Sequence, residues 1–147
     1  MTGDAVGRAM EILLVEDDLE DAGLTIESLR GGEVPCRVSL VRDGEEAIAF
    51  LRRRGHYGRA PRPDVILLDL HLPKLGGREV LADIKNDDQL RPIPVVVLTS
   101  SRSHREILQS EELHVEDYLT KPVDFEQFAG VVKSLRKYML ADVVMPK

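Results

Sequence analysis

The chain of 147 residues is poor in cysteine, in aromatic residues and in long apolar runs. It contains one cysteine, Cys36, no tryptophan and 4% aromatic residues. A single thiol excludes an internal disulfide framework and a cluster of cysteine ligands around a metal ion. No apolar run approaches the roughly 18 residues that a membrane-spanning helix needs. Residues 1–10 also lack the apolar block of a signal peptide, so we expect a cytoplasmic protein with no membrane partner.

Positive charge and nucleotide-binding motifs are scarce as well. Acidic residues number 26 against 20 basic ones, which gives a formal net charge of −6 and argues against a nucleic-acid partner. The chain has no glycine-rich phosphate loop of the Walker or dinucleotide type. None of the four histidines lies in the sequence context of a nucleophile elbow. They are His56, His71, His104 and His114.

Short apolar segments alternate with segments of helical period along the chain. Four near-continuous apolar runs and one more mixed run predict strands at residues 12–15, 37–41, 65–68, 95–98 and 115–119. Near-continuous runs are typical of parallel strands buried on both faces, and the mixed run at 37–41 suits an edge strand. A strand and a helix alternate five times, which indicates one doubly wound α/β domain.

Polar residues follow four of these predicted strands directly. Glu16, Asp17 and Asp18 follow the first, Asp69 the third, Thr99 and Ser100 the fourth, and Lys121 and Pro122 the fifth. In an open parallel sheet the carboxyl ends of the strands share one edge, where ligands bind. The sequence therefore predicts one polar site at this edge.

Three of these acids are expected to crowd together if the first and third strands are neighbours. Two like charges about 4 Å apart repel by roughly 4 kcal/mol at an effective dielectric constant of 20. Either a proton or a cation must then relieve the repulsion among Glu16, Asp17 and Asp69. Oxygen ligands alone favour Mg²⁺ or Mn²⁺ over zinc. We interpret Asp18 as the cap of the first helix.

A cation and a hydroxyl complete the predicted site. Lys121 can pair with the carboxylates or act as a point charge on a phosphoryl oxygen, and Thr99 can donate its hydroxyl to the same group. The peptide bond before Pro122 is a candidate for the cis form. A flavodoxin would need an uncharged first loop for the FMN phosphate, whereas this loop is acidic.

The set Glu16-Asp17, Asp69, Thr99, Tyr118 and Lys121-Pro122 resembles, in order and spacing, the receiver domain of bacterial two-component response regulators, the CheY-like family. The resemblance covers residues 11–138, with residues 1–10 as a flexible N-terminal arm and residues 139–147 as a C-terminal tail. The loop at 55–63 and the stretches 70–74 and 113–114 look like single-domain regulators that work with bacterial phytochrome histidine kinases.

The resemblance implies a five-stranded parallel sheet of order 2-1-3-4-5, similar to flavodoxin. It implies that Asp69 accepts a phosphoryl group from a phosphohistidine of a sensor histidine kinase, in a reaction that needs Mg²⁺ or Mn²⁺. Asp17 and Asp69 would ligate the metal directly, Glu16 through water, and His71 through its backbone carbonyl. Lys121, Thr99 and Tyr118 would be the catalytic and switch residues, with Ser100 and Pro122 as auxiliary residues of the phosphate loop.

The resemblance also implies how such a protein signals. Phosphorylation would change the surface of the fourth helix, fifth strand and fifth helix, at about 103–138, and a homodimer would form through it. Nine residues remain after Tyr138, so we expect a stand-alone regulator that controls a protein target. The sequence identifies neither that target nor the kinase. A phytochrome-type kinase would make the input signal light.

The sequence departs from the usual receiver pattern at one turn, and one function of a different class is weighed against the receiver interpretation. Gly76-Gly77 stands where many receivers have an acidic residue before glycine, and we expect it to loosen the turn after Pro73. A small Mg²⁺-dependent phosphatase or phosphotransferase acting on a diffusible substrate would also use an aspartyl nucleophile. Such enzymes commonly have a second aspartate two residues later, where this chain has His71. A receiver-like protein that only binds partners is disfavoured by the full acidic set.

Overall fold

The computed structural model describes residues 8–32, 34–70, 72, 76–100 and 115–135. Residues 1–7 of the expected arm, residues 101–114 of the region expected to hold the fourth helix, and the expected C-terminal tail lie outside this part of the chain. Within it, no helix is long and apolar enough to cross a membrane.

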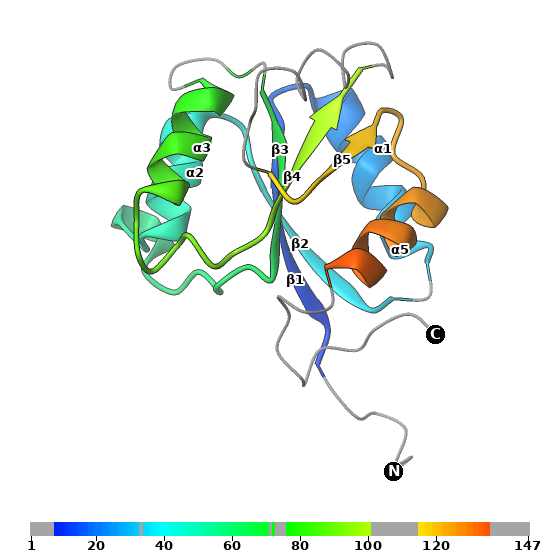
Figure 1. Cartoon of the computed structure of the whole chain (residues 1–147), viewed down its shortest axis with the longest axis horizontal. Coiled ribbons are helices and arrows are strands. Elements are labelled where there is room, and N and C mark those ends of the chain that lie inside the picture. The colour runs from blue at the N-terminus through cyan, green and yellow to red at the C-terminus, as the bar shows by residue number, and fades with distance from the viewer. Residues whose placement is uncertain (1–7, 33, 71, 73–75, 101–114, 136–147) are drawn as a thin grey trace.

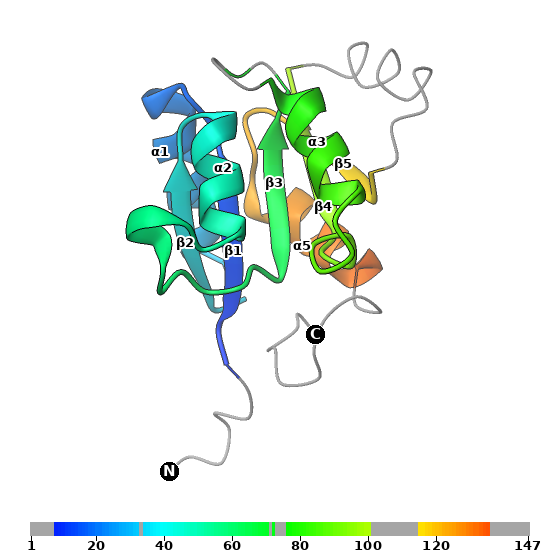
Figure 2. The same cartoon turned by 90° about the vertical axis from the view of Figure 1, so that its left-hand side faces the viewer.

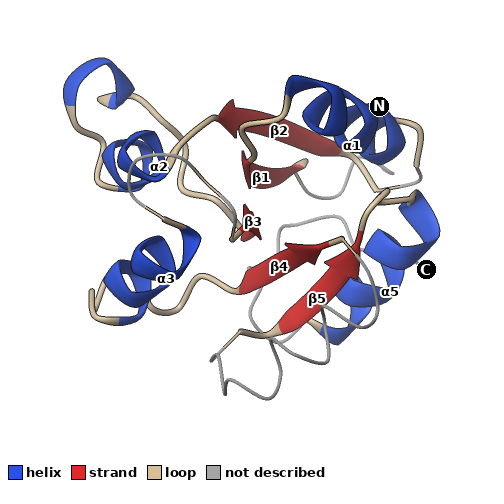
Figure 3. Ribbon diagram, turned by 90° about the horizontal axis from the view of Figure 1, so that it is seen from above, coloured by secondary structure: helices blue, strands red, loops and turns tan. Residues whose placement is uncertain are grey.

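Five parallel strands form the centre of the molecule (Figure 1). They are β1 (Met10–Val15), β2 (Cys36–Val41), β3 (Val65–Asp69), β4 (Val95–Thr99) and β5 (Asp117–Thr120). Their spatial order is β2-β1-β3-β4-β5, which confirms the order implied by the sequence resemblance (Figure 3). The mixed run forms β2 at one edge of the sheet, as expected.

Helices cover both faces of the sheet. They are α1 (Leu19–Arg30), α2 (Gly44–Leu51), α3 (Gly77–Lys85) and α5 (Phe125–Ser134), with a short 3-10 turn η1 (Gly55–Tyr57) after α2. The helices α2 and α3 lie on one face, and α1 and α5 lie on the other (Figures 2 and 3). The predicted cap Asp18 is present, and Asp43 and Asp124 cap α2 and α5 in the same way: each of the three accepts a hydrogen bond from a backbone N–H in the first turn of its helix.

The near-continuous apolar runs arise because both faces of the central strands are buried. In β3, Ile66 and Leu68 pack into the core beneath α2 and α3, whereas Val65 and Leu67 pack into the core beneath α1 and α5. The same alternation holds in β1 and β4. A polar residue inside such a strand would lose its water on either face, so polar groups are confined to the strand ends.

The strand boundaries differ from the predicted ones at both edges of the chain. β1 begins at Met10, one residue before the expected domain start, and the preceding Arg8 forms a bidentate ion pair with Asp64 at 2.7 Å. β5 begins at Asp117, later than predicted. Glu116 instead accepts a hydrogen bond from the Val95 backbone N–H at 3.0 Å and pairs with Lys85 at 3.0 Å.

Candidate functional site

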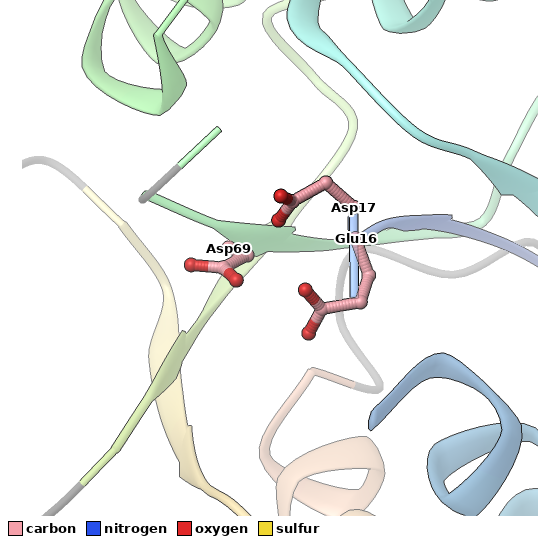
Figure 4. Close-up of side chains that lie close together, drawn as sticks. All are labelled: Glu16, Asp17 and Asp69. Carbon is pink, nitrogen blue, oxygen red and sulfur yellow. The ribbon is translucent and has the colours of Figure 1, made fainter. Parts of the chain in front are cut away.

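Three carboxylates meet where two neighbouring strands end. Val15 of β1 pairs with Leu68 of β3, so the residues that follow them, Glu16 and Asp69, lie side by side. Asp17 comes next in the chain, and oxygen atoms of all three side chains lie within 4.8 Å of one another. Figure 4 shows the three carboxylates gathered at this edge. The structure confirms the crowding that the sequence predicted.

Burial makes this crowding costly for Glu16 in particular. Glu16 and Asp69 are only 1% and 5% exposed, whereas Asp17 is half-buried. Burial, together with the hydrogen bond and charge of Asp69, raises the pKa of Glu16 to about 7, although Lys121 acts in the opposite direction. Without a cation, the pocket therefore holds a proton on Glu16 through mildly acidic pH.

Lys121 supplies the positive charge that faces these carboxylates. Its Nζ lies 2.5 Å from Glu16 Oε1 and 3.0 Å from Asp69 Oδ2. Burial lowers the pKa of the Lys121 ammonium, but its hydrogen bonds to Glu16 and Asp69 and their charges raise it, and the net shift is upward. The ammonium is therefore a permanent charge at neutral pH.

The backbone around Lys121 is held by the neighbouring elements. Its N–H donates to the Thr99 carbonyl at 2.7 Å, and the Lys121–Pro122 peptide bond, for which the sequence left both forms open, is cis. Gln127 of α5 brackets Thr120, accepting from the Thr120 N–H at 3.1 Å and donating to the Thr120 carbonyl at 3.2 Å. Its side-chain amide also donates to the helix cap Asp124 at 3.3 Å. These contacts join β4, β5 and α5 at the site.

A pocket of about 270 Å³ opens beside the carboxylates. Its lining comprises Glu16, Asp17, Asp18, Asp21, Asp69, Leu98, Ser100 and Lys121. Of the other predicted site residues, Thr99 and Tyr118 are buried and do not line it, and Tyr118 packs into the core on the α2–α3 face. Pro122 borders a separate small cavity, and His71 lies outside the described residues.

Two contributors to this edge have no signal in the sequence. Asp21, in the first turn of α1, places Oδ2 at 3.3 Å from Lys121 Nζ. Arg42, just after β2, donates to the backbone carbonyl of Asp17 at 3.2 Å. Both are ordinary surface residue types at unremarkable positions, and only the folded chain brings them to the site.

Gly77 has a packing role at the end of β3. Its N–H donates to the Leu70 carbonyl at 3.3 Å, and a Cβ at this position would lie 2.4 Å from Leu70 Cα and 2.8 Å from the Asp69 carbonyl oxygen. Glycine thus lets the start of α3 approach the backbone that carries Asp69. This close approach holds the strand end and the helix together at that point.

The donor set suits a small divalent cation. Glu16, Asp17 and Asp69 offer carboxylate oxygens, with no sulfur or imidazole in the group that the described residues form. Hard oxygen donors beside an open pocket match Mg²⁺ or Mn²⁺, which retain water and take few protein ligands. The residues present therefore fit such an ion.

The chain is similar to known proteins over most of its length. A model of the response regulator receiver domain matches residues 12–133 of the chain. The chain belongs to the response regulator receiver family. Its five-stranded parallel sheet of order β2-β1-β3-β4-β5 is thus the fold of a receiver domain.

The similar proteins include Rcp1 and two receivers, AtBRR and RcpA, that are named as bacteriophytochrome or phytochrome response regulators. Response regulator Rcp1 of Synechocystis sp. is 44% identical over 135 residues, which is 92% of each chain. The bacteriophytochrome response regulator AtBRR has a TM-score of 0.82 at 41% identity, over 95% of this chain and 99% of its own. The phosphorylated cyanobacterial phytochrome response regulator RcpA has a TM-score of 0.71 at 46% identity, over 95% and 100%. Rcp1 itself has been solved in a Mn²⁺-bound form, with a TM-score of 0.70 over 94% of this chain and 99% of its own.

Proposed function

We propose that this receiver domain is a phosphoacceptor in which Asp69 receives a phosphoryl group from a phosphohistidine of a sensor histidine kinase. One observation carries the proposal. The buried Asp69 carboxylate lies at the wall of an open pocket, 3.0 Å from the ammonium of Lys121 and beside two further carboxylates. A nucleophile, a fixed positive charge and a set of hard oxygen donors are the parts that phosphoryl transfer needs.

The proposed transfer forms one bond to phosphorus and breaks another. An oxygen of the Asp69 carboxylate attacks phosphorus, and the bond between phosphorus and the imidazole nitrogen breaks. The other ring nitrogen of the phosphohistidine carries a proton. The electron pair of the broken bond stays on the released nitrogen, so the kinase histidine leaves as neutral imidazole and Asp69 becomes an acyl phosphate. Lys121 offsets negative charge on the phosphoryl oxygens during transfer.

The proposed metal ligands are Asp17 and Asp69 directly, Glu16 through water, and the backbone carbonyl of His71. Bound Mg²⁺ or Mn²⁺ would neutralise charge on the transferring group. The support is the all-oxygen donor set of the described residues and the Mn²⁺-bound form of the similar Rcp1.

The proposed switch begins at Thr99 and Tyr118. The Thr99 hydroxyl would turn toward the phosphoryl oxygens, Tyr118 would change its packing, and Ser100 and Pro122 would complete the phosphate loop. The contact of the Thr99 carbonyl with the Lys121 N–H supports a link between β4 and the site. The surface that changes would comprise the expected fourth helix, β5 and α5, and it would serve a homodimer and a protein target.

The proposed kinase partner is of the phytochrome type. Support comes from the similar proteins Rcp1, RcpA and AtBRR, of which the last two are named as phytochrome or bacteriophytochrome response regulators. We further propose a cytoplasmic location and a receiver domain that extends to about residue 138. Its start moves from residue 11 to Arg8, because Arg8 pairs with Asp64 and β1 begins at Met10.

Acetyl phosphate with Mg²⁺ tests the proposal without a kinase. We expect an alkali-labile label that reaches a plateau near one phosphoryl group per chain. Sustained turnover of varied phosphoesters would instead indicate the alternative, an enzyme acting on a diffusible substrate. Absence of any label, with Mg²⁺ bound, would overturn phosphoacceptance.

A further inference from the structure

Asp21 is a carboxylate of the pocket lining that stands outside the group formed by Glu16, Asp17 and Asp69. Its Oδ2 lies 3.3 Å from Lys121 Nζ, but it is not part of the group whose oxygens lie within 4.8 Å of one another. Its side chain is 42% exposed, at the rim of the pocket. Its backbone N–H donates to the Asp18 cap at 3.0 Å, which fixes its place in the first turn of α1.

Lys121 therefore has partners of two kinds. Glu16 and Asp69 belong to the carboxylate group that suits a divalent cation, whereas Asp21 stands outside that group. A cation that binds the carboxylate group competes with the ammonium for Glu16 and Asp69, and the two positive charges repel each other. Asp21 is then the remaining carboxylate among the described ion partners of Lys121.

We propose that Asp21 is a positioning residue that retains the Lys121 ammonium at the rim when a divalent cation takes Glu16 and Asp69, and that it thereby strengthens cation binding. This inference rests on the proposed function in one respect, the divalent cation at this pocket. Loss of the Asp21 charge should weaken cation binding through both the metal-free and the cation-bound state. In the metal-free protein, the ammonium would pair more firmly with Glu16 and Asp69, which the cation must then take over. In the cation-bound protein, the ammonium would lack a counter-charge.

The main chain of Lys121 limits how else the ammonium can respond. The Thr99 carbonyl holds the Lys121 N–H, and Gln127 brackets the preceding Thr120. Because this backbone is held, a shift of the ammonium must come from rotation of the lysine side chain. Asp21 Oδ2 already lies 3.3 Å from Lys121 Nζ, so the rotated ammonium can keep this contact.

Mn²⁺ binding to the unphosphorylated full chain tests the inference, with the electron paramagnetic resonance signal of free Mn²⁺ as the readout. We expect Asp21→Asn to raise the Kd for Mn²⁺ by about two- to fivefold, the range of a partly exposed ion pair. Glu20→Gln is the matched control, because it removes one charge from the same turn of α1 and Glu20 is not among the ion partners of Lys121. We expect Glu20→Gln to change the Kd by less than about twofold.

A Lys121→Met background separates positioning from general electrostatics. There, Asp21→Asn should raise the Kd no more than Glu20→Gln does. An equal effect of the two substitutions in the wild-type background, or an undiminished effect of Asp21→Asn without Lys121, would overturn the inference. Wild-type protein that binds no Mn²⁺ would instead overturn the proposed cation site itself.

Discussion

The Asp69 carboxylate and the Lys121 ammonium lie 3.0 Å apart, although 52 positions separate them in the sequence. Asp69 is the last residue of β3, and Lys121 directly follows β5. In the sheet, β4 lies between these two strands. The lysine side chain thus crosses the end of β4 to reach the acids. Because Glu16 shares the same ammonium, a change of charge at any of these residues is felt by the others.

Removal of one acid from the crowded group should stabilise the metal-free protein. We expect Asp17→Asn to raise the free energy of unfolding in EDTA by about 1 kcal/mol, because it removes like-charge repulsion from Glu16 and Asp69. The same substitution should weaken Mg²⁺ binding, since it removes an oxygen charge from the donor set. Urea unfolding with and without Mg²⁺ measures both effects.

Asp18→Asn is the control for Asp17→Asn. It removes one charge from the next residue, while asparagine keeps the helix cap that Asp18 forms with the backbone N–H groups of Glu20 and Asp21. We expect a stability change of less than about 0.5 kcal/mol. Equal or lower metal-free stability of Asp17→Asn would contradict the crowding.

The raised pKa of Glu16 predicts how stability depends on pH. The folded chain retains this proton up to about pH 7, whereas an unfolded chain loses it near pH 4.5. Folded protein binds the extra proton within that window, so the free energy of unfolding of metal-free protein should fall as pH rises from about 4.5 to 7. The expected fall is on the order of 2 kcal/mol.

Glu16→Gln should remove this fall, because glutamine does not titrate. Thermal or urea unfolding in EDTA across the same pH range provides the comparison. A decline of equal size in Glu16→Gln would assign the pH dependence to other groups.

The close approach of α3 to the end of β3 predicts a sharp difference between two adjacent glycines. Gly77→Ala would push a Cβ against Leu70 Cα and the Asp69 carbonyl oxygen, so we expect a loss of stability on the order of 2 kcal/mol and weaker Mg²⁺ binding. Gly76→Ala meets nothing closer than Glu79 Oε1 at 3.8 Å and should cost less than about 1 kcal/mol. Similar losses of stability in the two variants would contradict the packing role of Gly77.

An exposed leucine beside the site predicts where a kinase docks. Leu24 of α1 is 49% exposed and borders a small cavity together with Lys121 and Pro122. We expect Leu24→Ser to slow phosphotransfer from a phosphorylated phytochrome-type kinase by about tenfold, because apolar anchors dominate such contacts. Labelling by acetyl phosphate needs no docking and should be unchanged. Equal slowing with both donors would place the effect at the chemical site.

Much of the fold and the core of the site followed from the sequence. Strands buried on both faces leave near-continuous apolar runs, and these located β1, β3 and β4 within a few residues. The order of polar residues after those runs then brought Glu16, Asp17, Asp69 and Lys121 to one edge. Parallel strands all end at the same side, so this inference needs no detail of packing.

The remaining features depend on tertiary contacts that leave no pattern. The pairing of Arg8 with Asp64 spans 56 positions, and the approach of Asp21 to Lys121 spans 100. The start of β5 shifts because Glu116 bonds to the Val95 N–H and to Lys85. Gly77 was expected to loosen a turn, yet its lack of a side chain is what permits a close contact.

Mapping the phosphoryl group after reaction with acetyl phosphate and Mg²⁺ tests the central claim most directly. Intact-mass measurement should show one phosphoryl group on the wild-type chain and none on Asp69→Asn, which preserves the side-chain shape but removes the nucleophile. The folded state of Asp69→Asn should be checked by cooperative unfolding in urea. A phosphoryl group that persists on folded Asp69→Asn would contradict the assignment of Asp69 as the acceptor.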